Sequence, residues 1–134
     1  MLLIWCYILL QEYSIDEECV IIGGFSGGAI TFLDITFANV IPIKGFSVIG
    51  PDFPESFTKE NIKLAAERGF RGIFMEGEIL IPLEEQEEMI KVFEEVDLPY
   101  EFYVNKGIGH AVPQDLPDKL NKALSFIHNR QCVL

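Results

Sequence analysis

A short apolar run that ends at paired glycines constrains this chain more than any other feature. Residues 20–22 read Val-Ile-Ile, and residues 23–28 read Gly-Gly-Phe-Ser-Gly-Gly. From Ala29 to Val40, apolar residues recur at helical spacing. A buried strand that turns sharply into a helix explains this order, because glycines tolerate the crowding of a tight turn. The stretch therefore predicts a strand–turn–helix unit with Ser26 at the tip of the turn.

Ser26 lies between Gly24 and Gly28 in the pattern G-x-S-x-G. After a strand and before a helix, this pattern is typical of a nucleophile elbow, in which the serine hydroxyl stands clear of the backbone. The free N–H groups at the start of the helix favour negative charge beside that hydroxyl. A serine that only caps the helix is the simpler alternative. Dinucleotide and phosphate loops are excluded, since neither G-x-G-x-x-G nor a following Lys-Ser or Lys-Thr is present here.

Beyond this unit, apolar runs alternate with amphipathic segments. The runs predict strands at Cys19–Ile22, Ile43–Ile49, Arg71–Glu76 and Pro99–Asn105. The amphipathic segments predict helices at Ala29–Val40, Thr58–Arg68, Leu83–Val96 and Pro117–His128, with residues 1–12 as a further helix that is apolar nearly all round. Strands that alternate with helices pair in parallel through right-handed crossovers. We expect an α/β fold, with a mostly parallel sheet of about four strands flanked by helices, in a single domain over residues 1–134.

Composition argues against several classes of function. The chain has 134 residues, 49% of them hydrophobic, and a net charge of −11. This charge opposes binding to nucleic acid or to an anionic membrane surface, because both are polyanions. The apolar N-terminus lacks the basic residue and cleavage site of a signal peptide, and it is shorter than the about 20 residues of a membrane span.

Cysteines and acidic residues predict neither disulfides nor a metal site. Cys6, Cys19 and Cys132 are scattered and show no C-x-x-C spacing, which favours a reducing cytoplasm and no disulfide framework. The glutamates of Leu83–Val96 fall on the outer face of that helix, as in a solvated surface. No metal or organic cofactor is predicted.

Three polar stretches follow the carboxyl ends of predicted strands: Ser26, residues 76–82 and His110. Ligand sites of parallel sheets lie beyond these ends. We expect the three stretches to converge at one edge of the sheet.

At this point the chain resembles the α/β-hydrolase family, and most closely its carboxylesterase, phospholipase and dienelactone-hydrolase-like members. The resemblance rests on residues 24–29 after a strand, on residues 77–82 after another, and on Gly107-Ile108-Gly109-His110 before the last helix. The family order of serine, acid and histidine is present. The resemblance covers only the C-terminal half of the family's fold. It implies that Ser26 is the nucleophile, His110 its base, and the Gly27 N–H a donor to the oxyanion, with no cofactor.

The acid departs from the family's pattern. Family members commonly place an Asp three residues after a Gly and four residues before a Pro. Counting from Gly77 gives Leu80, which cannot serve, whereas counting back from Pro82 gives Glu78. We expect Glu78 to orient His110 as an aspartate does. Glu76 is the alternative, and a triad without an acid is the third possibility.

Two functions follow from the resemblance. The first is a serine hydrolase for carboxylic esters or thioesters. The second is a truncated, catalytically impaired module that acts in interaction or assembly, because the family's second oxyanion donor comes from an earlier loop. The predicted strand Cys19–Ile22 would then lie at the edge of the sheet. An apolar, unguarded edge invites pairing with another chain, so we expect a homo-oligomer through it.

Overall fold

A computed structural model describes residues 8–79 and 83–128 of this chain. Its sheet has four parallel strands in the spatial order β1 (Ile21–Phe25), β2 (Gly45–Ile49), β3 (Arg71–Gly77) and β4 (Tyr100–Asn105). The spatial order equals the chain order, so each crossover moves one strand further in the same direction. The predicted α/β class and parallel sheet are therefore confirmed.

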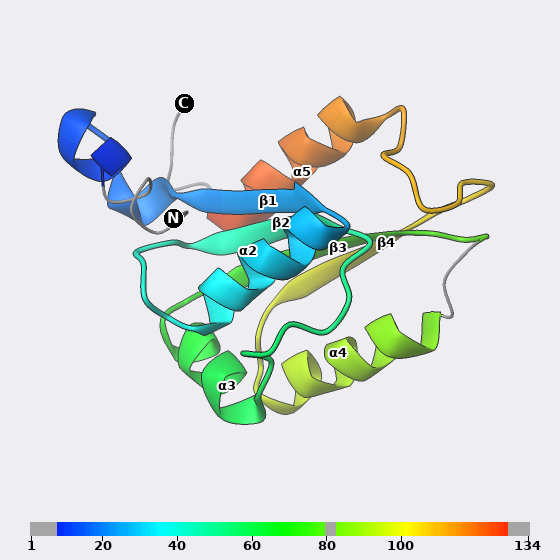
Figure 1. Cartoon of the computed structure of the whole chain (residues 1–134), viewed down its shortest axis with the longest axis horizontal. Helices are drawn as coiled ribbons and strands as arrows, with labels where there is room; N and C mark the ends of the chain where they lie inside the picture. Colours follow the sequence, from blue (N-terminus) through cyan, green and yellow to red (C-terminus); the bar gives the residue numbers. More distant parts are fainter. Residues whose placement is uncertain (1–7, 80–82, 129–134) are drawn as a thin grey trace.

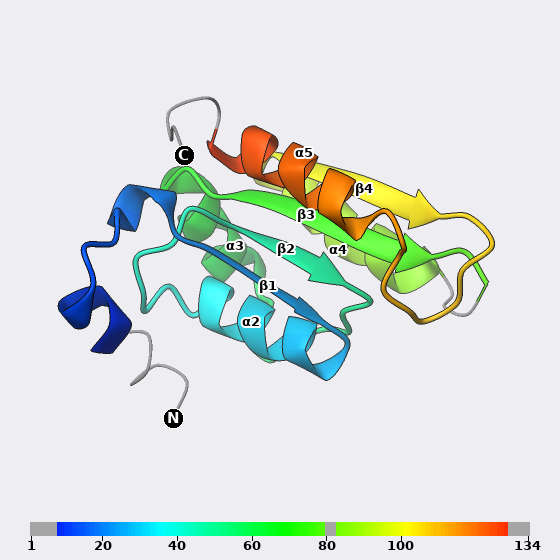
Figure 2. The same ribbon diagram turned by 90° about the horizontal axis from the view of Figure 1, so that it is seen from above.

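The helices cover both faces of this sheet (Figures 1 and 2). α2 (Gly27–Phe37), α3 (Lys59–Glu67) and α4 (Leu83–Glu95) pack on one face, and α5 (Leu116–His128) packs on the other. A 3-10 turn, η1 (Glu17–Cys19), precedes β1. The predicted N-terminal helix lies partly outside the described residues, and its residues 8–12 are helical.

Apolar side chains fill both layers. The larger core lies between the sheet and helices α2 to α4, where the rings of Phe37, Phe46 and Phe74 surround Phe93. The smaller core lies under α5, where Ile127 packs with side chains from β2 and β3. Every residue of β2 is buried. A parallel strand covered on both faces has this uniform burial, which explains its unbroken apolar sequence.

The first strand departs from the prediction. It was expected at Cys19–Ile22 and lies instead at Ile21–Phe25, because Gly23 and Gly24 continue the ladder opposite Ser47 and Val48 of β2. Cys19 belongs to the preceding turn and is disulfide-bonded. The prediction of no disulfide is thus wrong at Cys19, and the argument for a reducing cytoplasm loses its support.

Within the described ranges, no helix is long and apolar enough to cross a membrane.

Candidate active site

Ser26 occupies the turn between β1 and α2. Its backbone has φ 55° and ψ −124°, a conformation that costs energy for a residue with a side chain and that often marks a functional site. The Ser26 side chain makes no capping hydrogen bond to α2. Its Oγ instead lies 2.8 Å from Nε2 of His110. The Ser26 hydroxyl therefore does not cap α2, which was the simpler alternative for this serine.

The turn that carries Ser26 is tightly packed. A Cβ on Gly24 would lie 2.6 Å from the Phe32 ring and 2.8 Å from the backbone of Gly28, so no larger residue fits there without movement. The Ser26 amide donates to the carbonyl of Ile49, which ties the turn to the end of β2. This packing explains why the glycines of the motif accompany the serine.

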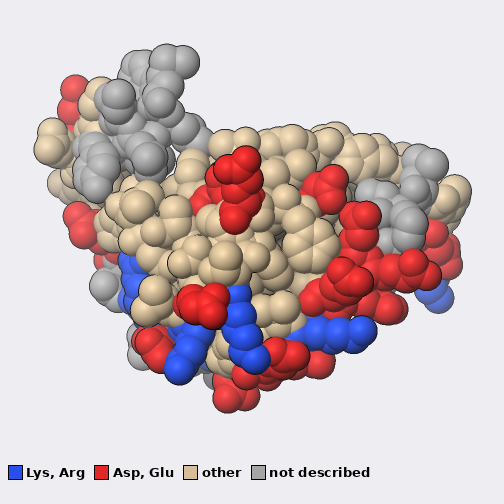
Figure 3. Space-filling model, turned by 60° about the horizontal axis from the view of Figure 1, so that its bottom comes forward, with Lys and Arg blue, Asp and Glu red and all other residues tan. Residues whose placement is uncertain are grey.

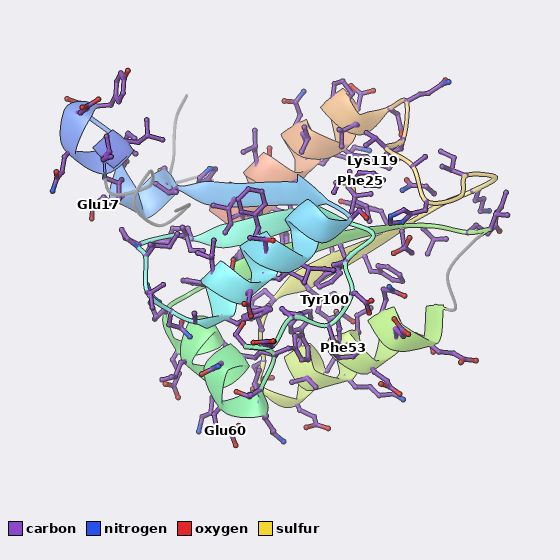
Figure 4. The ribbon with its side chains drawn as sticks, in the orientation of Figure 1. Glu17, Phe25, Phe53, Glu60, Tyr100 and Lys119 are labelled. Carbon is purple, nitrogen blue, oxygen red and sulfur yellow. The ribbon has the colours of Figure 1, made fainter. Side chains whose placement is uncertain are left out.

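His110 lies in the loop after β4 and reaches the elbow across the carboxyl ends of the strands. Its ring centroid is 4.8 Å from that of Phe25, which Figure 4 labels at the end of β1. On another side it meets Gly50, whose φ is +58°. A Cβ on Gly50 would lie 2.6 Å from Cε1 and 2.8 Å from Nδ1 of His110. The imidazole position therefore depends on a bare backbone at Gly50.

Glu76 is the acidic neighbour of His110. The residue is 1% exposed, near the carboxyl end of β3, and its Oε1 accepts a hydrogen bond from the Gly77 amide at 2.9 Å. Its Oε2 has no hydrogen-bond partner among the described residues. Burial raises the pKa of the Glu76 carboxyl, while the Gly77 amide and attraction to His110 oppose that rise. The point 2.8 Å from His110 Nδ1 where a Gly50 Cβ would stand is 3.8 Å from Glu76 Oε1, so both groups border the same space.

The Glu78 carboxylate lies elsewhere. Its side chain is exposed, and Oε2 accepts a hydrogen bond from the Gly107 amide at 2.9 Å. This contact ties the loop after β3 to the loop that carries His110. Leu80, the position given by the family's spacing from Gly77, lies outside the described residues. The structure thus brings the alternative acid, Glu76, to the histidine, and gives Glu78 a contact with the loop backbone.

Gly27 is the first residue of α2, and its N–H is one of the helix donors that have no acceptor within the helix. The surroundings of Gly27 are open, since a Cβ there would meet nothing within 4 Å. An anion beside Ser26 would face the positive end of the α2 dipole.

A cavity of about 250 Å³ opens beside the elbow. Its walls come from the turn at Ser26, α2, the loop after β2, the first turn of α4 and the loop after β4. They comprise Ser26, Ile30, Gly50, Pro51, Asp52, Glu85, Gln86 and His110. The volume is below the about 300 to 1,000 Å³ of pockets that hold drug-sized ligands, so it suits a small group. Among the described residues, no group of three His, Cys, Asp or Glu side chains could hold a metal ion.

The sequence did not predict three features of this site. They are the burial of Glu76, the contact between Gly50 and His110, and the position of Gln86 in the cavity wall. One of them had a sequence signal. Gln86 falls at helical spacing with Met89 and Phe93, so a polar residue stands in the inward row of α4. The other two depend on contacts between loops far apart in the chain.

Neither a protein-family model nor a curated protein matches this chain. Solved structures do. An uncharacterised protein from Bacillus cereus ATCC 10987 aligns with a TM-score of 0.80 at 23% identity, over 95% of this chain and 41% of that one. The Bacillus cereus carboxylesterase aligns with a TM-score of 0.69 at 17% identity, over 90% of this chain and 56% of that one. Arabidopsis thaliana SOBER1 aligns with a TM-score of 0.69 at 22% identity, over 94% and 60%.

These similarities define the fold. The chain has an α/β-hydrolase-like fold, as the resemblance in its sequence implied. It spans about two fifths to three fifths of the length of these solved chains. At these identities the similarity establishes the architecture alone.

Proposed function

We propose that this chain is a serine hydrolase that cleaves carboxylic esters or thioesters through an acyl-enzyme. The observation that carries the proposal is the 2.8 Å contact between Ser26 Oγ and His110 Nε2 at a strained turn. A serine hydroxyl is a weak nucleophile unless a base takes its proton, and this contact supplies the base. The esterase fold of the solved neighbours supports the same chemistry.

A residue of the candidate site takes part in each step of the proposed reaction. Ser26 Oγ attacks the acyl carbon as His110 Nε2 takes its proton, and the carbonyl electrons move onto the oxygen beside the Gly27 N–H. His110 then returns the proton to the leaving alcohol or thiol, and the C–O or C–S bond breaks. Water attacks the acyl-enzyme in the same way and frees the acid. Glu76 is the positioning residue, since its buried carboxyl stabilises the imidazolium that forms in both steps.

A second function is favoured by one observation. Among the described strands, β1 pairs only with β2, and its Ile21 and Ile22 are half-buried, so this edge is a template for pairing with another chain. The alternative is a catalytically impaired module that serves in assembly. For either function we propose a homo-oligomer through the edge strand β1, and no nucleic-acid partner.

Labelling with a fluorophosphonate probe, read by intact mass, tests the hydrolase. The probe reacts with an activated serine and does not require the natural substrate. We expect one adduct on the wild-type chain and none on Ser26→Ala or His110→Ala. Ser125→Ala is the matched control, because Ser125 is exposed on α5 and its hydroxyl donates to the carbonyl of Asn121 in its own helix. Folded wild-type protein that takes no adduct would favour the assembly module.

A further inference from the structure

The Phe25 ring contacts the histidine of the candidate site, although the proposed reaction assigns it no role. Phe25 is the last residue of β1 and comes directly before Ser26. Its ring centroid lies 4.8 Å from that of His110, and the two ring planes are inclined by 31°. Aromatic rings attract one another at centroid distances of about 4.5 to 7 Å, and a cation within about 6 Å of a ring is attracted to its face. The Phe25 ring can therefore stabilise both the neutral and the charged imidazole.

Packing of the fold does not account for an aromatic residue at Phe25. Its side chain is 37% exposed and lies outside both apolar cores. By contrast, Phe46 and Phe74 are fully buried and pack against Phe93. An exposed side chain at the end of an edge strand removes little apolar area from water. Loss of the Phe25 ring should therefore cost little stability, so its contact with His110 can be tested in folded protein.

Few contacts fix the orientation of His110. The residue is exposed in the loop after β4. Its Nε2 lies 2.8 Å from Ser26 Oγ, while Nδ1 makes no hydrogen bond to a described residue. One hydrogen bond leaves a ring free to turn about it, and proton transfer depends on the alignment of the two groups. The backbone of Gly50 borders the imidazole, and the Phe25 ring is the aromatic surface against which it packs.

Phe25 contacts His110 from outside the cavity. Ser26 and His110 line the cavity of about 250 Å³, whereas Phe25 is not one of its lining residues. A substrate in the cavity would therefore meet the imidazole and not the Phe25 ring. An interaction that acts on the transition state and not on the bound substrate changes kcat and leaves KM unchanged.

On the basis of the proposed hydrolase, we propose that Phe25 is a positioning residue, which holds the His110 ring toward Ser26 and stabilises the imidazolium that forms as Ser26 attacks. Both effects act at the same step, because His110 gains its proton when Ser26 Oγ bonds the acyl carbon. The strength of contacts between a cation and an aromatic face corresponds to about threefold to thirtyfold in rate.

Rate measurements on three variants test this role. Phe25→Leu removes the ring and keeps an apolar side chain, whereas Phe25→Tyr keeps the ring. Phe53→Leu is the matched control, because Phe53 is 40% exposed and its ring pairs with that of Phe57 (Figure 4 labels Phe25 and Phe53). With 4-nitrophenyl acetate as the probe, kcat of Phe25→Leu should fall about threefold to thirtyfold at unchanged KM. Phe25→Tyr and Phe53→Leu should keep both constants near those of the wild type.

A pH titration of His110 by NMR gives a readout that a merely structural role would not move. The charged groups around His110 are Glu76 at the end of β3, and Asp52 and Glu85 in the wall of the same cavity. The chain carries a net charge of −11, and Figure 3 shows acidic side chains gathered over the part of the surface where α4 begins. All this negative charge favours an imidazolium, but none of it changes in Phe25→Leu. A change in the titration therefore reports the ring.

The second histidine of the chain, His128 at the end of α5, is an internal reference for this titration. The Phe25 ring favours the charged imidazole, so its removal should favour the neutral form. We expect the titration midpoint of the His110 resonances to be lower in Phe25→Leu by about 0.5 to 1.5 pH units, the same free energy as the expected change in rate. The midpoint of His128 should not move.

The outcomes separate Phe25 from the hydrolase itself. An unchanged kcat and an unchanged His110 midpoint in folded Phe25→Leu would reject the role of Phe25, even where wild-type protein takes the fluorophosphonate adduct. A higher KM at constant kcat would also reject it, because the ring would then bind substrate. Equal losses in Phe53→Leu would indicate a general loss of packing. A shifted midpoint in protein that takes no adduct would keep the action of Phe25 on His110 and reject the hydrolase. Phe25→Ile, whose branched side chain suits a strand, serves if Phe25→Leu does not fold.

Discussion

Ser26 and His110 are 84 positions apart in the chain, yet their side chains are in hydrogen-bond contact. The contact uses a backbone conformation at Ser26 that side chains rarely adopt. Such strain persists only where the surrounding structure enforces it, and here the Ile49 carbonyl and the crowded Gly24 do so. This strained contact supports the proposed role of Ser26 as nucleophile, and the proposed acid partner of His110 is the next residue to test.

Replacing each acid in turn answers that question. Glu76→Gln should lower the rate of fluorophosphonate labelling at least about tenfold, because an amide cannot stabilise the imidazolium as a carboxylate does. The thermal midpoint of Glu76→Gln should not fall, since the change removes a charge that burial disfavours. Glu78→Gln should label at nearly the wild-type rate, because its amide oxygen still accepts from Gly107. The opposite ranking would restore Glu78 as the partner of His110.

At the scale of elements, the loops after β2, β3 and β4 hold one another in place. Backbone hydrogen bonds join Glu78 to Asn105 and Ile79 to Ile108, so the loop after β3 supports the loop that carries His110. The loop after β2 supplies Gly50 against the imidazole. Three loops that follow adjacent parallel strands thus build one side of the site, as the convergence of strand ends predicts.

Gly50→Ala tests this support. A methyl at Gly50 meets the imidazole and takes a strained φ, so we expect both labelling and stability to fall. Gly69→Ala is the matched control, because Gly69 also has positive φ, +81°, but a methyl there meets nothing within 4 Å. It should lose only about 1 kcal/mol of stability and label normally. Labelling of Gly50→Ala at the wild-type rate in folded protein, by mass and circular dichroism, would show that His110 does not depend on this contact.

At the scale of the whole molecule, β1 is the edge of the sheet and pairs only with β2 among the described strands. Ile21 and Ile22 are half-buried, while Gly23 and Phe25 are exposed. An edge strand with apolar residues and no charged guards is a template for pairing with another chain. This edge carries the proposal of a homo-oligomer.

Sedimentation at several protein concentrations checks the assembly. We expect a mass above one chain that falls on dilution. Amide hydrogen exchange should locate the contact, because β1 amides that point away from β2 gain protection only when another strand pairs with them. A single-chain mass at every concentration, or protection in β1 that does not change with assembly, would contradict pairing through this edge.

The sequence by itself determined the class of fold and singled out Ser26 and His110, whose side chains meet in the structure. Apolar periodicity reports which residues face a core, so it predicted the order of strands and helices, and G-x-S-x-G at the first turn predicted the elbow at Ser26. The bounds of β1 differ from the prediction because the ends of a strand depend on its pairing. Gly23 and Gly24 predict a turn from sequence, yet in the structure they pair with β2. Element boundaries are decided by such neighbours.

Only the tertiary structure shows that Glu76 is buried near His110, and which residues line the cavity. Glu76 and Glu78 are two positions apart and look equivalent in sequence, but one is buried beside the imidazole and the other is exposed on the loop. Asp52 and Glu85 belong to separate parts of the chain and line one cavity only once the chain has folded. These outcomes depend on distances between segments that are remote in the chain. Local periodicity carries no information about such distances, because it records each residue's burial and not its partner.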